Sequence, residues 1–231
     1  GLPLALHFSS KYKTTAFNID KSRIASLKKN VDPTETFSKT EIKKAKNLQF
    51  TNNVDDLHKC NIFIVTVPTP VNKQKNPDLK DLSSACKLIG SILKHNDIVI
   101  FESTVYPGAT EEVCVPILEK YSNLKYVNEE NRKKIKDNFF YCGYSPERIN
   151  PGDKNKTLEQ IIKITSGSTK LVSKKIDKLY KSIIHAGTYN VESIKIAEAA
   201  KIIENTQRDV NIALINELSI IFKKMGIDTE K

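Results

Sequence analysis

A glutamate on a short, proline-stiffened loop is the first residue whose position suits catalysis. Glu147 follows the dipeptide Ser145-Pro146, which comes shortly after the apolar run 138–142. The run reads as a buried strand, and the proline restricts the backbone of the loop that leaves it. A carboxylate held at the carboxyl end of a strand can act as a general base. The alternative is a surface ion pair between Glu147 and Arg148.

Three polar side chains recur along one side of a long helical segment. They are Lys201, Asn205 and Arg208, spaced by four and then three positions, which places them on one face of a helix. A solvated polar stripe gives the same spacing. However, alanine and isoleucine occupy positions 199–200 and 202–203, so we expect a helix that is buried on most sides. Lysine and asparagine on such a helix need partners, and beside a reacting carbon they could stabilise an oxyanion.

Two threonines follow apolar runs that read as buried strands. Thr69 lies between two prolines after residues 61–67, and Thr104 follows residues 97–102 just before a Pro-Gly turn. Ligands of open α/β sheets bind outside the carboxyl ends of the strands, so both hydroxyl groups could meet a ligand there. The alternatives are that Thr69 only ends a strand and that Thr104 only caps the turn.

The start of the chain has the pattern that ends a dinucleotide-binding fingerprint. A Rossmann domain opens with a strand and G-x-G-x-x-G, and Gly1 with the helix-like run to Phe8 fits the third glycine and its helix. An acidic residue that holds the ribose is expected roughly 20 positions downstream. Asn18 and Asp20 lie 17 and 19 positions after Gly1, where a strand expected at residues 14–19 ends. The alternative for both is a plain N-cap of the next helix.

Strand-like and helix-like segments alternate along the chain. Apolar, β-rich runs predict strands at residues 14–19, 61–67, 97–102, 138–142 and 161–165. Amphipathic stretches predict helices at residues 21–29, 79–93, 110–121 and 170–184. The alternation indicates an α/β fold with a Rossmann-like, doubly wound parallel sheet. The first three strands should run parallel in that sheet, which would bring Asn18, Thr69 and Thr104 to one edge.

A long helix should follow this domain. Residues 192–224 contain neither proline nor glycine and repeat apolar residues at helical spacing, well beyond the usual ~8–20 residues. We therefore expect an NAD-binding, Rossmann-like domain at 1–190 and the start of a helical dimerisation domain at 191–231. One neighbouring element cannot bury all the apolar residues of the helix, which predicts a homodimer. The alternative is that a further domain covers part of them. These residues are Ile212, Leu214, Ile215, Leu218, Ile220, Ile221 and Phe222.

Composition and charge exclude several classes of protein. The 231 residues are 39% hydrophobic and 28% charged, as in globular rather than disordered proteins. The net charge of +10 comes from scattered lysines without an RNA-binding aromatic motif, so we expect no nucleic-acid partner. No apolar run is long enough to span a bilayer, and the first residues lack a basic signal-peptide lead. We therefore expect a cytoplasmic protein with no membrane partner.

The cysteines do not form a metal-binding or redox motif. Cys60, Cys86, Cys114 and Cys142 are widely spread, and none belongs to a C-x-x-C pair. We expect free thiols in a reducing compartment and no metal site.

Four blocks of the sequence, taken in order, identify a family. Together they resemble the UDP-glucose/GDP-mannose dehydrogenase family, and the last two resemble its UDP-N-acetylhexosamine 6-dehydrogenases, which make uronic acids for surface polysaccharides. The blocks are V-P-T-P at 67–70, E-S-T-V-Y-P-G at 102–108, Y-S-P-E-R-I-N-P-G-D at 144–153 and E-A-A-K-I-I-E-N-T-Q-R-D-V-N at 198–211.

The resemblance implies a double oxidation of a UDP-sugar with NAD as cofactor. It implies that Thr104 meets the nicotinamide end and holds a water, that Glu147 activates that water, and that Lys201 stabilises alkoxide-like states. The implied catalytic residues are Thr104, Glu147, Lys201 and Asn205. The implied cofactor contacts are Gly1, Asn18, Asp20, Arg23, Thr69 and Thr104. The implied substrate contacts are Glu147, Arg148, Ile149, Lys201, Asn205 and Arg208.

The family pattern is incomplete in this chain. The first strand, two fingerprint glycines, the G-G-x-C-x-x-P type block with the nucleophilic cysteine, and the C-terminal UDP-sugar-binding domain have no counterpart. The chain therefore resembles a member truncated at both ends, and we expect it to be inactive alone. One alternative is a non-catalytic module of the same family that binds cofactor weakly or dimerises. Another is a dehydrogenase of the hydroxyacid or 6-phosphogluconate type.

Overall fold

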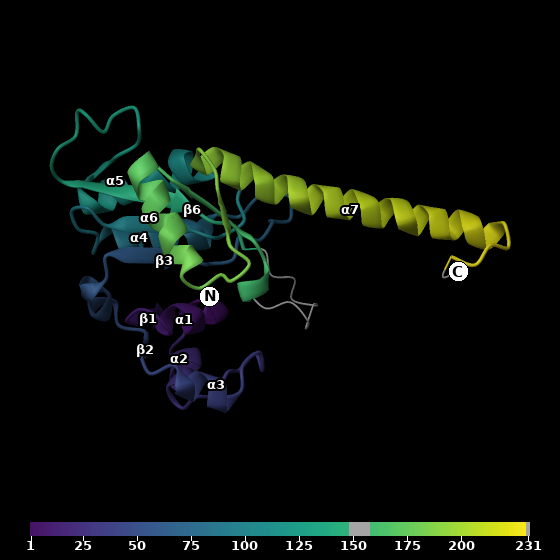
Figure 1. The fold of residues 1–231 in the computed structure, drawn as a ribbon, viewed down its shortest axis with the longest axis horizontal. Helices are drawn as coiled ribbons and strands as arrows, with labels where there is room; N and C mark the ends of the chain where they lie inside the picture. The colour runs from purple at the N-terminus through teal and green to yellow at the C-terminus, as the bar shows by residue number, and fades with distance from the viewer. Residues whose placement is uncertain (148–157, 230–231) are drawn as a thin grey trace.

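The described part of the chain is a mixed α/β domain from which one long helix projects. The computed structural model describes residues 1–147 and 158–229 (Figure 1). Arg148 and Ile149, two of the expected substrate contacts, lie outside the described residues. The α/β class and the long helix after the sheet agree with the sequence analysis.

The larger sheet has the strand order β3-β4-β6-β7-β8, with β5 paired to β6. Its strands are β3 (Ile62–Val65), β4 (Ile98–Phe101), β5 (Lys125–Tyr126), β6 (Phe139–Tyr144), β7 (Lys163–Gly167) and β8 (Thr188–Asn190). The neighbouring pairs are parallel except β6 and β7, which run antiparallel. The Rossmann-like parallel sheet expected from the sequence is therefore confirmed, with β7 as an antiparallel exception. An apolar run predicts a buried strand but carries no information about its direction.

A separate two-stranded sheet contains the first strand of the chain. Its members, β1 (Thr14–Phe17) and β2 (Leu48–Thr51), run parallel. The expectation that residues 14–19 share a sheet with the next two predicted strands is wrong, because β1 hydrogen-bonds to β2 and not to β3. The sequence analysis did not predict β2, since four residues with a polar Gln49 among them form no recognisable apolar run.

Helices cover the strands and connect them. The α-helices are α1 (Leu2–Ser9), α2 (Lys21–Lys28), α3 (Lys39–Lys44), α4 (Lys80–Gly90), α5 (Val115–Ser122), α6 (Lys170–Lys181) and α7 (Ile194–Lys224). Shorter helical turns are η1 (Val54–Lys59), η2 (Thr110–Cys114) and η3 (Leu158–Gln160). Each helix expected from the sequence is confirmed with slightly different bounds, and α3 is an addition. The turn η2 is a π-helix that runs directly into α5.

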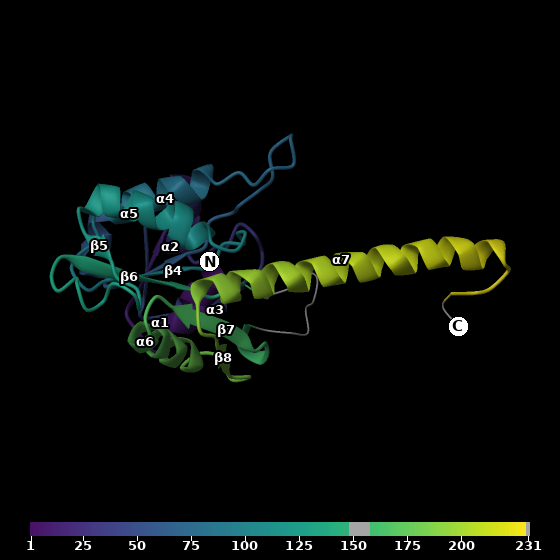
Figure 2. The same cartoon turned by 90° about the horizontal axis from the view of Figure 1, so that it is seen from above.

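The central strand β4 is buried on both faces, which explains its unbroken apolar run. Ile98 and Ile100 pack into a cluster with side chains of α1 and α6. Val99 and Phe101 pack into the opposite cluster, with side chains of α4 and α5. The same layers are visible in Figure 2, where α4 and α5 lie on one side of the sheet and α1 and α6 on the other. Helices on both faces are typical of a doubly wound fold.

The helix α7 packs on the domain only through its first turns. It is continuous over 31 residues and is capped by Ser193, whose hydroxyl accepts the backbone N–H of Ile196 at 3.2 Å. Ile194, Ala197 and Glu198 are buried, and the remainder of the helix extends away from the domain (Figure 1). Within the described ranges, neither α7 nor any other helix has the length and apolar character needed to cross a membrane.

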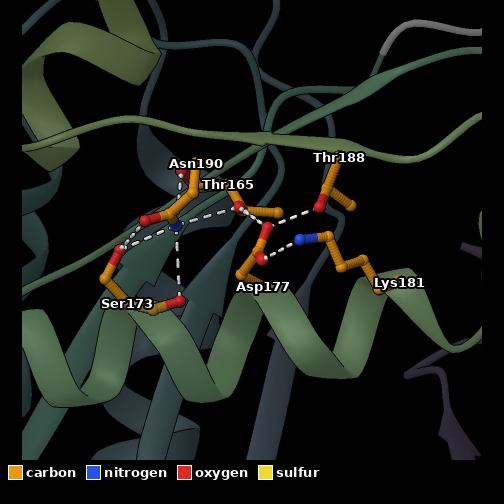
Figure 3. A network of polar contacts seen from close by, with 6 residues as sticks. All are labelled: Thr165, Ser173, Asp177, Lys181, Thr188 and Asn190. Atoms are coloured by element: carbon orange, nitrogen blue, oxygen red, sulfur yellow. Dashed lines mark hydrogen bonds and ion pairs between the residues drawn. The ribbon is translucent and has the colours of Figure 1, made fainter.

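A network of side-chain hydrogen bonds joins α6 to β7 and β8 (Figure 3). Asp177 on α6 accepts the hydroxyl groups of Thr165 at 2.9 Å and Thr188 at 2.5 Å. The side-chain amide of Asn190 donates to Thr165 Oγ1 at 3.1 Å and to Ser173 Oγ at 2.8 Å. The network therefore fixes the antiparallel strand β7 in position against its helix.

We expect Asp177→Ala to destabilise the fold. The substitution removes the acceptor of the fully buried Thr165 hydroxyl, at a cost of about 1–3 kcal/mol. Burial raises the pKa of Asp177, but hydrogen bonds from Lys181, Thr188 and Thr165 outweigh it and hold the pKa below its ordinary value. The stabilisation is thus complete above the ordinary pKa and is lost as the pH falls through the depressed one.

Urea denaturation of wild type and Asp177→Ala at neutral and acidic pH measures both effects. Asp55→Ala is the control, because Asp55 is exposed and lies 3.9 Å from His58 in a surface pair, a setting in which ion pairs contribute little. Equal losses of stability in the two variants would contradict the prediction.

Candidate active site at the carboxyl edge of the sheet

The two threonines singled out in the sequence meet where β3 and β4 end. Thr69 Oγ1 donates a hydrogen bond of 2.5 Å to the carbonyl oxygen of Thr104. Beside it, Ser103 Oγ donates to the carbonyl oxygen of Val67 at 2.7 Å. These two bonds tie together the loops that leave neighbouring parallel strands. Thr104 itself is exposed, so its side chain is accessible to a ligand.

Lys201 of α7 contacts the main chain of the loop that carries Glu147. Lys201 Nζ donates to the main-chain carbonyl oxygen of Glu147 at 2.5 Å, across 54 positions of the sequence. Both residues are half-buried. Because Phe101 of β4 pairs with Tyr144 of β6, the loops that carry Thr104 and Glu147 leave adjacent strands at the same edge. The contact joins α7 to that edge.

The other two residues of the helix face have different surroundings. Asn205 is half-buried one turn beyond Lys201. Arg208 is exposed, and its Nη2 lies 3.0 Å from Glu204 Oε1 in a pair along the helix. The expectation of a helix buried on most sides is wrong in this region, since Ile203 is 67% exposed. The reason is that α7 leaves the domain here, so nothing in the described chain covers its outer face.

Gly1 lies at the same edge of the sheet, beside the end of β3. A Cβ added at Gly1 would lie 2.6 Å from Thr66 Oγ1, so the backbone at the start of α1 is in direct contact with the residue after β3. Gly1 is the N-cap of α1 and supplies no side chain to its first backbone N–H groups. Such free N–H groups at a helix N-terminus favour anions such as phosphate.

The candidate ribose ligands take part in capping a helix. Asp20 is the N-cap of α2, and its Oδ1 accepts the backbone N–H groups of Ser22 at 2.8 Å and Arg23 at 3.1 Å. Asn18 Oδ1 accepts the backbone N–H of Asp20 at 2.9 Å. The capping alternative is thus present for Asp20. The expectation that Asn18 shares one sheet edge with the two threonines is wrong as stated, because Asn18 follows β1, which belongs to the separate sheet.

A buried ion pair behind the threonine loop was not predicted. Glu102, which directly follows β4, lies 3.0 Å from Lys163 Nζ at the start of β7, and both side chains are at most 2% exposed. Tyr180 of α6 donates its hydroxyl to Glu102 Oε1 at 2.5 Å. The available signal was Lys163 itself, a charge inside the apolar run I-I-K-I, because a charged residue in a buried strand requires a partner.

A second buried charged residue that the sequence analysis did not single out is Glu198. Its side chain is fully buried, although it lies only three positions before Lys201 on α7. It accepts the backbone N–H groups of Gly108 and Thr110, at the far end of the loop that carries Thr104. A glutamate in the first, buried turns of the helix was the signal that could have revealed it.

Three of the four cysteines are poorly suited to nucleophilic chemistry because they are buried. Cys86, Cys114 and Cys142 are buried and Cys60 is half-buried, all as free thiols. Burial raises the pKa of Cys142 well above its ordinary value, whereas a nucleophilic cysteine must be accessible as the thiolate. In the part of the chain that the structure describes, no group of His, Cys, Asp and Glu residues is arranged to hold a metal ion.

The ion pair between Glu102 and Lys163 can be tested by measuring the free energy of unfolding of variants. We expect Glu102→Gln or Lys163→Met alone to destabilise the protein by about 3–5 kcal/mol, because each leaves one buried charge without its partner. The double variant Glu102→Gln/Lys163→Met should recover most of this loss. Urea denaturation of the four proteins measures the coupling free energy. Additive losses in the double variant would contradict the ion pair.

Models of two related domains match the chain. Residues 1–203 match the UDP-glucose/GDP-mannose dehydrogenase family, NAD binding domain, and residues 195–231 match the central domain of that family. The UDP-N-acetyl-D-glucosamine 6-dehydrogenase of Pseudomonas aeruginosa is 56% identical over 230 residues, with 100% of this chain and 52% of the relative covered. Protein CapL of Staphylococcus aureus is 49% identical over 231 residues, again with 52% of the relative covered. The chain thus spans about half the length of these relatives.

Solved structures agree with the family models. The UDP-D-ManNAc dehydrogenase of Pyrococcus horikoshii superposes with a TM-score of 0.86 at 31% identity, over 98% of this chain and 52% of that one. The GDP-mannose dehydrogenase of Pseudomonas aeruginosa has a TM-score of 0.87 over 99% of this chain and 52% of that one, and its 19% identity supports the fold alone. The chain therefore belongs to the UDP-glucose/GDP-mannose dehydrogenase family.

Proposed function

We propose that the full-length protein containing this chain is an NAD-dependent UDP-N-acetylhexosamine 6-dehydrogenase that supplies a uronic acid for surface polysaccharide. The contact of Lys201 with Glu147 is the observation that carries the proposal. It brings a cation to the loop of a candidate base, at the edge where ligands of α/β sheets bind. The UDP-N-acetyl-D-glucosamine 6-dehydrogenase with 56% identity supports the sugar class.

The N-terminus of α1 and the ends of β3 and β4 fit a dinucleotide. The backbone N–H groups after Gly1 would receive the pyrophosphate, and Thr69 and Thr104 would line the nicotinamide end. Asn18, Asp20 and Arg23 are the proposed ribose contacts. Bound NAD would supply the hydride acceptor for oxidation at C6 of the sugar.

The remaining steps would use polar groups of this chain. Lys201 and Asn205 would stabilise the negative charge that develops on the C6 oxygen. Glu147 would accept the proton of the water that releases the acid, with Thr104 holding that water. We propose Arg208 as a substrate contact that α7 presents from its exposed side. The proposed substrate contacts Arg148 and Ile149 lie outside the described residues.

The second oxidation in this family uses a cysteine thiolate. Half-buried Cys60 precedes β3 and therefore lies at the opposite end of that strand from the candidate site. Cys86, Cys114 and Cys142 are buried in the core. We therefore propose that residues 1–231 alone do not complete the reaction. Expression of these residues beside the full-length protein tests this, and sustained formation of uronic acid by the shorter form would overturn it.

We expect Lys201→Met in the full-length protein to lower kcat by about 10²–10³-fold, as when an oxyanion-stabilising donor is removed. The measurement is NADH formation with UDP-N-acetylhexosamines. The matched control is Lys195→Met, which removes an exposed lysine of the same helix, 3.7 Å from Glu112, and should keep nearly wild-type kcat.

Two outcomes would count against the proposal in different ways. An unchanged kcat in Lys201→Met would remove Lys201 from the catalytic machinery. A wild-type protein that reduces no NAD with any UDP-N-acetylhexosamine would favour the alternative of a non-catalytic module that binds cofactor or dimerises.

We also propose that the protein is a homodimer through α7. Ile203, Val210, Leu214 and Ile221 recur at helical spacing and are each 48–67% exposed. This is an apolar stripe that one helix rarely presents to water. A second copy of the helix, joined by other parts of the full-length protein, would cover it.

We expect Leu214→Glu in the full-length protein to raise the dissociation constant of the dimer by at least about tenfold, because it places a charge in the apolar stripe. Analytical ultracentrifugation over a concentration series measures the effect. Asn216→Glu adds the same charge at an exposed polar position on another side of the helix and should have little effect. A wild-type protein that stays monomeric at micromolar concentration would contradict the proposal.

A further inference from the structure

Glu198 makes an unusual connection between α7 and the loop that follows β4. Its carboxylate is fully buried. Oε2 accepts the backbone N–H of Gly108 at 2.5 Å, and Oε1 accepts the backbone N–H of Thr110 at 2.9 Å, about 90 positions earlier in the chain. Both carboxylate oxygens therefore accept hydrogen bonds from one short stretch of backbone.

The two N–H groups belong to the start of the helix formed by η2 and α5. Ala109, the N-cap of η2, supplies no side-chain cap. The first N–H groups of a helix have no partner within it, and a negative charge there is favourable. Glu198 therefore caps this helix from a distant element, where a neighbouring serine or aspartate would ordinarily serve.

Stability alone does not explain a carboxylate in this place. Burial raises the pKa of Glu198, and the hydrogen bonds from residues 108 and 110 only partly offset it. The ionised carboxylate thus carries a desolvation cost that an ordinary N-cap side chain would avoid. The long side chain of Glu198 instead fixes the position of α7 relative to the loop that follows β4.

That position matters because both elements carry candidate catalytic groups. Lys201 lies three residues after Glu198, on the same side of α7, and bonds to the Glu147 loop. The loop whose far end Glu198 holds begins with Ser103 and Thr104. Its end is also restricted, since Gly108 has a φ of +100° and a Cβ there would lie 2.5 Å from Glu112 Oε1.

We infer that Glu198 is a positioning residue, which sets the distance between Lys201 and the Thr104 loop without touching substrate. The inference rests on the proposed function. Glutamine in its place would accept one of the two N–H groups and would present its own amide N–H to the other. The loop would then shift relative to α7, and a misplacement of about 1 Å costs roughly 10²-fold in rate.

The test uses the full-length protein with Glu198→Gln, Glu198→Asp and the control Glu112→Gln. Glu112 is an exposed carboxylate near the same glycine. We measure kcat, the KM of NAD and of UDP-N-acetylhexosamine, and the thermal midpoint. The expected result is a loss of about 10²-fold in kcat for Glu198→Gln, with both KM values close to wild type. Glu198→Asp keeps the charge but shortens the side chain by one methylene, so it should also lower kcat, and Glu112→Gln should match wild type.

A lower thermal midpoint with an unchanged kcat would overturn the inference, because Glu198 would then only stabilise the fold. Failure of both Glu198 variants to fold would overturn it for the same reason. If the wild type is active and Glu198→Gln is equally active, the positioning role is rejected and the proposed function stands. An inactive wild type rejects the proposed function, and this inference falls with it.

Discussion

Two charged side chains within one turn of α7 hold the loops that leave β4 and β6. Glu198 accepts backbone N–H groups where the β4 loop enters η2, and Lys201 donates to the carbonyl oxygen of Glu147. Since three residues of a rigid helix separate them, the two loops cannot move independently of each other. The candidate site therefore depends on how the first turns of α7 pack against the domain. The rest of the helix extends outward.

Buried polar groups set the geometry behind this edge. Glu102, Lys163 and Tyr180 meet in an otherwise apolar layer between the sheet and α6. Such a pair adds little net stability, because desolvation offsets much of the attraction between the charges. It does require the start of β7 to lie against the end of β4, which is the arrangement that an antiparallel β7 produces. The antiparallel direction of β7 is therefore what places Lys163 beside Glu102.

Local patterns predicted most elements and part of the site. Apolar runs marked β3, β4 and β6 because both faces of these strands are covered. The positions of Thr69 and Thr104 after two of these strands predicted that they meet at one edge. Asp20 shows the limit of such patterns, since an acidic residue after a strand suits a ribose ligand and a helix cap equally well. Arg208 shows another limit. It lies on the same face of α7 as Lys201, but α7 has already left the domain at this position, so Arg208 is exposed.

The sequence by itself determined the α/β class, the long helix, the family and the residue types available for chemistry, because these depend on local periodicity and on ordered motifs. Only the tertiary structure decided that β1 pairs with β2, that β7 runs antiparallel and that Cys142 is inaccessible. It also decided that Glu198 faces Gly108. Those features depend on pairings between residues far apart in the chain, for which no local pattern carries a signal. A charged residue within an apolar segment indicates that it must have a partner, but only the tertiary structure shows which residue that partner is.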